Sequence, residues 1–568
     1  MIRRTARAVG LCLILAPTQA LAQAVSGAGQ EPAPIEAGLA SPPARYVDDG
    51  IDVRHYEIEL SLPDGAGAIT GWVEIELRAT APIDHVVLDF TGLRIDGVAV
   101  DGAPAEAWAH VDGLLSVPVP PASSGETRTL EISYGGVPDD GLILGETVHG
   151  APSAFVDNWP NRTRFWLPSV DHPSDKATAR ITVHAPAAWS VIANGREAKP
   201  AAPTAAEVRG PEVGPRRTWV YETDVDHPSY TLVVGGAEMV VDTLGYGACG
   251  RAPASPRADG CVAVSTWLFP ESAGRGGVSF RRAVEMIDFF SELVGPFPYE
   301  KLAHVQSATR FGGMENSSAI FYSQQGIASG RDMEGTVSHE TAHQWFGDSV
   351  TEKDWSHLWL SEGFATYFGA LFFEHTDGPQ ALQTRMAEAM ATYLASADTA
   401  RPVVDDRPDL FGMLNRNSYQ KGGVVLHMLR RELGDEAFFE AVREYSRIYR
   451  NATADTDDFR RVVEDVTGRE MGIFFRQWLH APGYPVLAVE TETGADGLRI
   501  HIRQTQAAPS PHFHIPIDVA VTWEGGAFRE TVRSTGETVT IRVPDAPADA
   551  RVVLDPEGWL LHRRVEGR

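Results

Sequence analysis

Two histidines four residues apart, with a glutamate directly after the first, constrain this chain more than any other feature. They form the segment His339-Glu340-Thr341-Ala342-His343, within a stretch from 333 to 346 that lacks proline. Residues four apart share one face of a helix, so both imidazoles can reach one metal ion and Glu340 can face an attacking water. Such a pattern arises by chance in roughly one chain of this kind in a few tens. Alone it therefore leaves open two ordinary histidines on a surface helix.

A third candidate ligand follows the histidine pair. Catalytic zinc sites use three protein ligands and keep one position open. Glu362 stands eighteen intervening residues after His343, inside the mostly apolar run 358–373. That run predicts a buried helix, where an acidic side chain is costly unless it is paired or bound to a metal. The alternative is a core glutamate held in a salt bridge.

Hydrophobic periodicity divides the chain into parts. With 568 residues, several domains are expected. Tyr56, Ile58, Leu60 and Leu62 alternate with polar residues, and similar patterns predict an N-terminal β domain over 46–243. Helical spacing dominates 244–485, and short alternating segments return over 486–568 as a small C-terminal β domain. The fold class expected is multidomain α+β.

Charge and composition exclude some classes of protein. Apolar residues make up 43% and charged residues 22%, as in globular chains. Lys and Arg number 49 against 76 Asp and Glu, a net charge of −27. Such a surface repels phosphate backbones, so nucleic acid is not an expected partner. No obligate protein partner is indicated.

The N-terminus has the features of an export signal. Three arginines precede a short apolar stretch, and Ala20-Leu21-Ala22 fits a cleavage site, which predicts a signal peptide at 1–22. The alternative is a membrane anchor, but the apolar run is far shorter than the ~20 residues of a spanning helix. Residues 23–45 are rich in Ala, Pro and Gly and predict a flexible linker. We expect no membrane span and an exported product, periplasmic or extracellular.

Two cysteines remain after residue 22. Cys249 and Cys261 are separated by 12 positions across a stretch rich in Gly, Pro and Ala. In an exported protein such a pair predicts a disulfide. Two free thiols are the alternative, and a zinc knuckle is disfavoured because no histidine or further cysteine lies nearby.

Three further motifs accompany the metal-binding pattern. They are Gly312-Gly313-Met314-Glu315-Asn316, Tyr419-Gln420-Lys421-Gly422, and the segment 164–177 with Leu167-Pro168, Asp171 and Lys176. Together the motifs resemble, in order, those of the aminopeptidase N and leukotriene hydrolase family of gluzincin zinc metallopeptidases. The resemblance implies an N-terminal β domain, a thermolysin-like α/β catalytic domain and a C-terminal β-sandwich. Many relatives also carry a long helical C-terminal domain, which is not seen here, so a more open cleft is expected.

The resemblance assigns chemistry to particular residues. One Zn²⁺ would be held by His339, His343 and Glu362. Glu340 would take a proton from the attacking water and pass it to the leaving amine. Tyr419 would donate a hydrogen bond to the tetrahedral oxyanion.

The same resemblance implies how substrate is bound. Glu315 would pair with the free α-ammonium of a peptide, and Gly312 and Gly313 would let the backbone approach it, while Met314 would line the first side-chain pocket or only pack. A second anchor for the amine, a Glu or Gln in many relatives, stays undecided here between Asp157 and Asn158. The implied function is a zinc-dependent aminopeptidase acting on peptides with free N-termini. A metalloendopeptidase on the same scaffold and a catalytically silent peptide-binding module are the alternatives.

Overall fold

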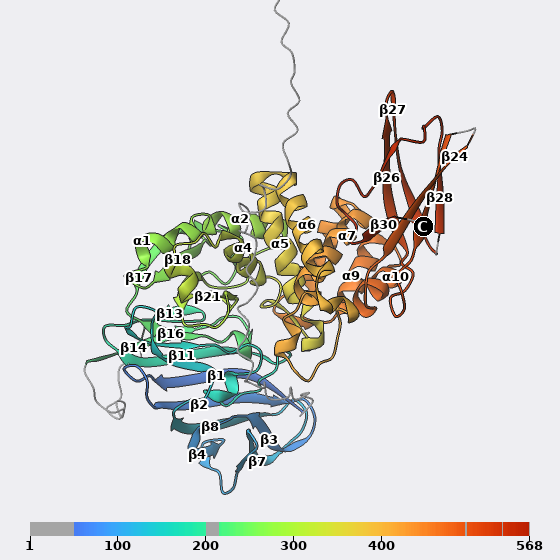
Figure 1. Ribbon diagram of the computed structural model, residues 1–568. Coiled ribbons are helices and arrows are strands. Elements are labelled where there is room, and N and C mark those ends of the chain that lie inside the picture. Colours follow the sequence, from blue (N-terminus) through green and yellow to red (C-terminus); the bar gives the residue numbers. More distant parts are fainter. Residues whose placement is uncertain (1–49, 200–214, 495–496, 537, 567–568) are drawn as a thin grey trace, which may run out of the picture.

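The computed structural model describes residues 50–199, 215–494, 497–536 and 538–566. The expected signal peptide at 1–22 and linker at 23–45 lie outside these ranges. Three parts follow one another in space: N-terminal sheets at one end, a helical part in the middle, and C-terminal sheets at the other end (Figure 1). The mixed α and β fold class expected from the sequence is confirmed.

The N-terminal part is built from three sheets. The largest has the order β13-β14-β11-β1-β2-β8-β4-β5, with β15 also paired to β11; the others are β12-β16-β10-β9 and β3-β7-β6. The alternation predicted from Tyr56 to Leu60 is confirmed, because these side chains are buried in β1. The strands are β1 (Ile51–Ser61), β2 (Ile69–Ala79), β3 (Ile83–Asp89), β4 (Arg94–Val100), β5 (Ala103–Pro104), β6 (Ala109–Val111), β7 (Leu114–Ala122), β8 (Thr127–Gly136), β9 (Leu142–Glu146), β10 (Pro152–Val156), β11 (Lys176–Pro186), β12 (Ser190–Ala193), β13 (Arg196–Ala198), β14 (Arg216–Glu222), β15 (His227–Pro228) and β16 (Val234–Ala237).

The middle part combines a five-stranded sheet with helices. The sheet has the order β17-β18-β19-β21-β20, so β20 is an edge strand. The expected boundary between 243 and 244 falls within β17, which pairs with β18 in this sheet. The sheet strands are β17 (Val240–Gly247), β18 (Val262–Leu268), β19 (Leu302–Ser307), β20 (Gly313–Met314) and β21 (Ala319–Ser323). The hairpin loop between β17 and β18 brings the sulfur atoms of Cys249 and Cys261 to 2.08 Å.

Two helices of this part, α1 and α2, lie between β18 and β19 in the sequence, and the others follow β21. The α-helices are α1 (Ala273–Gly276), α2 (Ala283–Leu293), α3 (Gln324–Ala328), α4 (Glu334–His343), α5 (Trp359–Asp377), α6 (Pro379–Leu394), α7 (Gly422–Leu433), α8 (Asp435–Ile448), α9 (Thr456–Thr467) and α10 (Gly472–Phe475). Two π-helical turns, η7 (Asn417–Lys421) and η8 (Arg476–His480), adjoin α7 and α10, and β22 (Val350–Glu352) pairs with β23 (Ala452–Ala454). Among the described residues, no helix combines the length and apolar character needed to cross a membrane.

The C-terminal part consists of two packed sheets of orders β28-β25-β24-β30 and β27-β26-β29. Their inward side chains, such as Ile500 and Ile517, belong to the same hydrophobic core as the helices of the middle part. The strands are β24 (Val486–Gly494), β25 (Gly497–Gln504), β26 (Ile515–Trp523), β27 (Gly526–Ser534), β28 (Thr538–Val543), β29 (Arg551–Leu554) and β30 (Arg563–Glu566).

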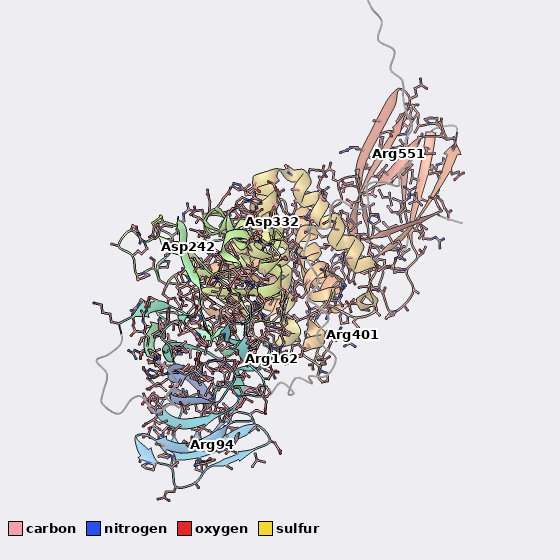
Figure 2. The ribbon with its side chains drawn as sticks, turned by 60° about the vertical axis from the view of Figure 1, so that its left-hand side comes forward. Arg94, Arg162, Asp242, Asp332, Arg401 and Arg551 are labelled. Atoms are coloured by element: carbon pink, nitrogen blue, oxygen red, sulfur yellow. A yellow bond between two sulfur atoms is a disulfide. The ribbon has the colours of Figure 1, made fainter. Side chains whose placement is uncertain are left out.

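The central sheet is covered on both faces. Along β19, Leu302 belongs to the core shared with the helices, whereas Ala303 and Val305 belong to the core of the N-terminal sheets. This explains why all six residues of β19 are buried. Figure 2 shows Arg94 at the outer end of the N-terminal sheets and Arg162 near their junction with the middle part, where its guanidinium lies 6.0 Å from the ring of Phe311.

Candidate active site

The two expected metal-binding histidines lie on α4 and face the same way. The Nε2 atoms of His339 and His343 are 3.0 Å apart. His343 is buried, and the side chain of His339 is 20% exposed, so the pair lies at the edge of the interior. The helix predicted from 333 to 346 is confirmed, although α4 itself ends at His343.

The third expected ligand meets the histidines from α5. The Oε2 atom of Glu362 lies 3.2 Å from His339 Nε2 and 3.3 Å from His343 Nε2. Glu362 is 4% exposed, within a helix whose residues are nearly all buried up to Phe373. Burial alone would raise the pKa of Glu362, but the two imidazoles outweigh burial and hold that pKa well below its usual value. The structure therefore brings the three predicted ligands together.

The spacing of these donors fits a zinc ion. Zinc bonds of 2.0–2.1 Å in tetrahedral geometry place neighbouring ligand atoms about 3.3 Å apart. The three separations here, 3.0, 3.2 and 3.3 Å, match that value. Two imidazoles and one carboxylate are also a donor set that suits zinc. Glu340 also offers an oxygen within 4.8 Å of both imidazoles, but Glu362 is the closer carboxylate.

The ring of His343 is oriented by the chain that follows it. Its Nδ1 lies 3.0 Å from the carbonyl oxygen of Phe346 and 3.0 Å from the hydroxyl of Ser361. Because a carbonyl only accepts, Nδ1 must carry the hydrogen, which leaves the Nε2 lone pair for a metal. Gly347 has a φ of 116°, and a Cβ there would collide with the Ser361 hydroxyl.

Glycines set how closely the site helices approach. A Cβ at Gly369 of α5 would lie 3.1 Å from the Cα of His339, and one at Gly363 would lie 2.9 Å from the Cα of Gly422. Glycine destabilises a helix interior relative to alanine, so glycines within a buried helix indicate close packing. Sequence reasoning missed Ser361 and these glycines. The two glycines of α5 could have been found from the sequence, because glycine is unusual inside an apolar helix. No feature of the sequence marks Ser361.

The side chain of Glu340 lies against the edge strand β20. It is 6% exposed, and a Cβ at Gly313 would overlap its carboxylate. Burial raises the pKa of Glu340 well above its usual value; His343 opposes this shift, and Glu315 and Glu362 add to it. Gly312 instead has open space where a Cβ would stand.

Glu315 directly follows β20, which pairs with β21 on one side only. Its side chain is 6% exposed, and burial raises the pKa of Glu315 to about 7. The backbone carbonyl of Glu315 accepts a hydrogen bond from Gln344 Nε2 at 2.9 Å, which links this segment to the end of α4. Met314 is buried in the core of the N-terminal sheets.

Tyr419 lies in the π-helical turn η7, against the ligand cluster. Its ring stacks on His339 with a centroid distance of 6.0 Å and an interplanar angle of 17°. Burial raises the pKa of Tyr419 well above its usual value, and the charge of Glu362 adds to this shift. The hydroxyl is therefore protonated and available as a donor over the whole neutral range. The three expected ligands, Glu340 and Tyr419 thus lie around one centre.

Asp157 and Asn158 make other contacts. Asp157 accepts from Arg162 Nη2 at 2.9 Å and from the Thr309 hydroxyl at 2.7 Å. Asn158 accepts from the indole of Trp166 and donates to the carbonyl of Leu232. The bond from Thr309 attaches the segment before β20 to the N-terminal sheets, and both side chains are engaged in hydrogen bonds inside the protein.

Comparison with known proteins identifies the family. Residues 278–478 match the peptidase family M1 domain, and residues 53–230 match the peptidase M1 N-terminal domain. The chain belongs to peptidase family M1. Both M1 models together cover about two thirds of it, and the site residues above lie inside the first match.

Relatives and solved M1 structures agree with this assignment. The chain is 26% identical over 495 residues to aminopeptidase M1-A of Oryza sativa subsp. japonica, covering 80% of this chain and 52% of that protein. It is 25% identical over 482 residues to leucyl aminopeptidase of Saccharolobus solfataricus, covering 80% and 56%. The chain thus spans little more than half the length of these curated relatives.

A solved structure matches over almost its whole length. The M1 zinc metallopeptidase from Deinococcus radiodurans is 28% identical, with a TM-score of 0.62, covering 76% of this chain and 93% of that one. A variant of that protein is described with a bound Tyr-ser-ala substrate. Zinc is the cofactor of this family, with one catalytic ion per site.

Proposed function

We propose that this M1 chain is a zinc-dependent aminopeptidase that hydrolyses the N-terminal bond of peptides. The observation that carries the proposal is the cluster of three donor atoms 3.0–3.3 Å apart. Two further carboxylates, Glu340 and Glu315, have their pKa values raised by burial beside it. Relatives of this chain are named as aminopeptidases, which supports the same reaction.

His339, His343 and Glu362 would hold the zinc ion. Zinc in such a site lowers the pKa of water and polarises a carbonyl oxygen. Glu340, on the same helix, would take the proton of the attacking water. Its raised pKa makes it a stronger base than an exposed carboxylate, and the same group then protonates the leaving amine.

The substrate would lie along β20. An edge strand has unpaired backbone groups, and an extended peptide can add to it as a further strand. Gly312 leaves open space on that path. Glu315, at the end of the strand, would bind the α-ammonium of the peptide, and an internal segment of a peptide offers no such charge.

Tyr419 would stabilise the oxyanion that forms at the scissile carbonyl. Its pKa is raised, so it donates a hydrogen bond without losing its proton. Removal of one such donor typically costs roughly 100- to 1000-fold in kcat.

The domain limits, export, disulfide and partners concern the whole protein. We propose the domain limits 46–243, 244–485 and 486–568, with 1–22 as a signal peptide, 23–45 as a linker, and export from the cytoplasm. The proximity of Cys249 and Cys261 supports a disulfide, which is stable in an oxidising compartment. The expected partners are peptides with free N-termini.

Glu340→Gln tests the proposed chemistry. The amide cannot accept the proton, so kcat on aminoacyl arylamides should fall roughly 100- to 10,000-fold. The zinc content, measured by elemental analysis, should stay at one per chain. Full activity in this variant, or wild-type activity that chelation and zinc supplementation leave unchanged, would contradict the proposal.

The internal hydrogen bonds of Asp157 and Asn158 favour one alternative, a metalloendopeptidase, because they engage two candidate anchors for the amine. Mass spectrometry of digests of free and N-acetylated peptides separates the two functions. Stepwise shortening from free N-termini, with acetylated peptides left intact, supports the aminopeptidase. Internal cuts in both peptides support the endopeptidase.

A further inference from the structure

The loop after α4 controls the orientation of one zinc ligand. The carbonyl of Phe346 receives the Nδ1 hydrogen of His343, and the backbone N–H of Asp348 donates to the carbonyl of His343 at 3.1 Å. The N–H of Gly347 donates to Val350 at 2.8 Å. A displacement of residues 346–349 would therefore move the imidazole of His343.

Two side chains of the N-terminal part hold this loop. The Nζ of Lys176, in β11, donates to the carbonyls of Asp348 at 2.9 Å and Ser349 at 2.8 Å, and to Ala452 at 3.2 Å. The hydroxyl of Tyr230 donates to the carbonyl of Gly347 at 3.2 Å. These contacts join residues more than one hundred positions apart in the sequence.

The surroundings of Lys176 make this contact specific. A protonated amine has three N–H groups, and here it meets three backbone carbonyls. Lys176 is 8% exposed, and a lysine is seldom buried to that extent because desolvation of its charge is costly. Burial lowers the pKa of Lys176 to about 7, and the nearby carboxyl groups of Asp348, Asp226 and Glu352 oppose this shift.

We propose that Lys176, supported by Tyr230, is a positioning residue of the zinc site. It fixes the 347–349 loop, and through Phe346 it fixes the ring of His343. The N-terminal sheets thus take part in building the metal centre that they do not themselves line. This inference rests on the proposed zinc ligation by His343.

A second buried lysine provides a matched control. Lys301 crosses the same interface in the opposite direction, and its Nζ donates to the carbonyls of Ala193, at 2.7 Å, and Gly195. These carbonyls belong to the N-terminal sheets and have no contact with the loop after α4. Lys301→Met therefore removes a comparable interface contact without touching the zinc site.

The test compares Lys176→Met with Lys301→Met in the full chain. The measurements are the zinc dissociation constant by chelator competition, the Tm of the metal-free and zinc-loaded forms, and kcat and KM. Both variants should lower the Tm of the metal-free form. Only Lys176→Met should weaken zinc binding, by about tenfold or more, as found for partners that orient metal-ligating histidines. Its kcat should fall while KM changes little.

Equal zinc affinity in wild type and Lys176→Met overturns the inference, and so does equal weakening in both lysine variants. If Lys176→Met does not fold, Lys176→Arg and Tyr230→Phe give the same comparison with milder changes. Zinc affinity is measured without peptide hydrolysis. Failure of the aminopeptidase proposal would thus appear as absent activity in wild type, with the difference in zinc affinity still present.

Discussion

The N-terminal and C-terminal sheets both pack on the middle part of the molecule, but their polar contacts reach different places. On the N-terminal side, hydrogen bonds end on the loop after α4 and on the segment after β20, as when Asn194 donates to the carbonyl of Ser317. On the C-terminal side, hydrogen bonds end on α7 and η8, as when Gln477 Nε2 donates to the carbonyl of His514 at 3.0 Å. One set of sheets therefore helps to shape the active site, and the other mainly stabilises the helices behind it.

The apolar cores reinforce this difference. Ile500 and Ile517 of the C-terminal sheets share one continuous core with α4, α5 and α7. The C-terminal sheets should then unfold together with the helices instead of as a separate unit. The N-terminal sheets have their own core, which includes Val305 and Phe321 of the central sheet and extends to Trp355 and Leu410 of the middle part.

Trp478→Ala should have the largest effect on stability and a small one on the site. Trp478 is 1% exposed, and truncation of a buried tryptophan typically costs about 3–5 kcal/mol. Thermal unfolding should show one transition at a lower Tm. The zinc dissociation constant and the KM of the folded fraction should match wild type, because the cavity forms behind α7. A tenfold change in zinc affinity would contradict the proposed division of roles.

Much of this arrangement could be predicted from the sequence, because its signals are local. The four-residue spacing of the histidines and the apolar run around Glu362 specify two buried helices, and α4 and α5 confirm them. The alternation in β1 and the strands from Val486 onwards are local patterns of the same kind. These local patterns predict which helix or strand carries each site residue. They do not predict which other residues it contacts.

The contacts that could not be predicted are those between distant segments. β17 shows no alternation of buried and exposed residues, and nothing in its sequence indicates that it pairs with β18 of the central sheet instead of an N-terminal strand. Lys176 belongs to a recognised motif, yet its partners at 348 and 349 lie more than 170 positions away. Likewise, the π-helical turn around Tyr419 has no distinct periodicity in so short a segment.

Mild acid should weaken the N-terminal interface through His227. Its ring stacks on Tyr299 at 5.1 Å, and within the described part of the chain neither ring nitrogen has a hydrogen-bond partner. Burial lowers the pKa of His227 to about 3, and the charges of Lys176 and Lys301 add to this shift. The unfolded state binds a proton below pH 6.5, but the folded state does not until about pH 3, so stability falls as the pH falls through this window.

His227→Phe keeps the ring on Tyr299 and removes the titration. Between pH 7.5 and pH 5, wild type should lose up to about 2 kcal/mol that this variant retains. Urea unfolding at both pH values measures the difference. His427→Phe makes the same change on the C-terminal side, as a comparison. There, burial lowers the pKa of His427 to about 4, and its ring stacks on Trp559. Identical pH slopes for wild type and His227→Phe would show that His227 titrates normally in the folded protein.

Tyr230→Phe should have the smallest effect and gives the sharpest test of the N-terminal contacts. It removes one hydrogen bond to the carbonyl of Gly347, worth about 1 kcal/mol of stability. Tyr221→Phe is the matched control, because that buried hydroxyl donates to the carbonyl of Val191 within the N-terminal sheets. Both variants should lower the Tm similarly, but only Tyr230→Phe should weaken zinc binding, by a few-fold.

A double-mutant cycle shows whether Tyr230 and Lys176 act on one loop. Both hold residues 347–349, so their effects on zinc affinity should be non-additive by about 0.5 kcal/mol or more. Tyr230 and Lys301 contact separate segments, and their effects should add. If the cycle with Lys176 is additive as well, the two side chains act independently. The N-terminal sheets would then hold the loop at two unconnected points instead of fixing one conformation of it.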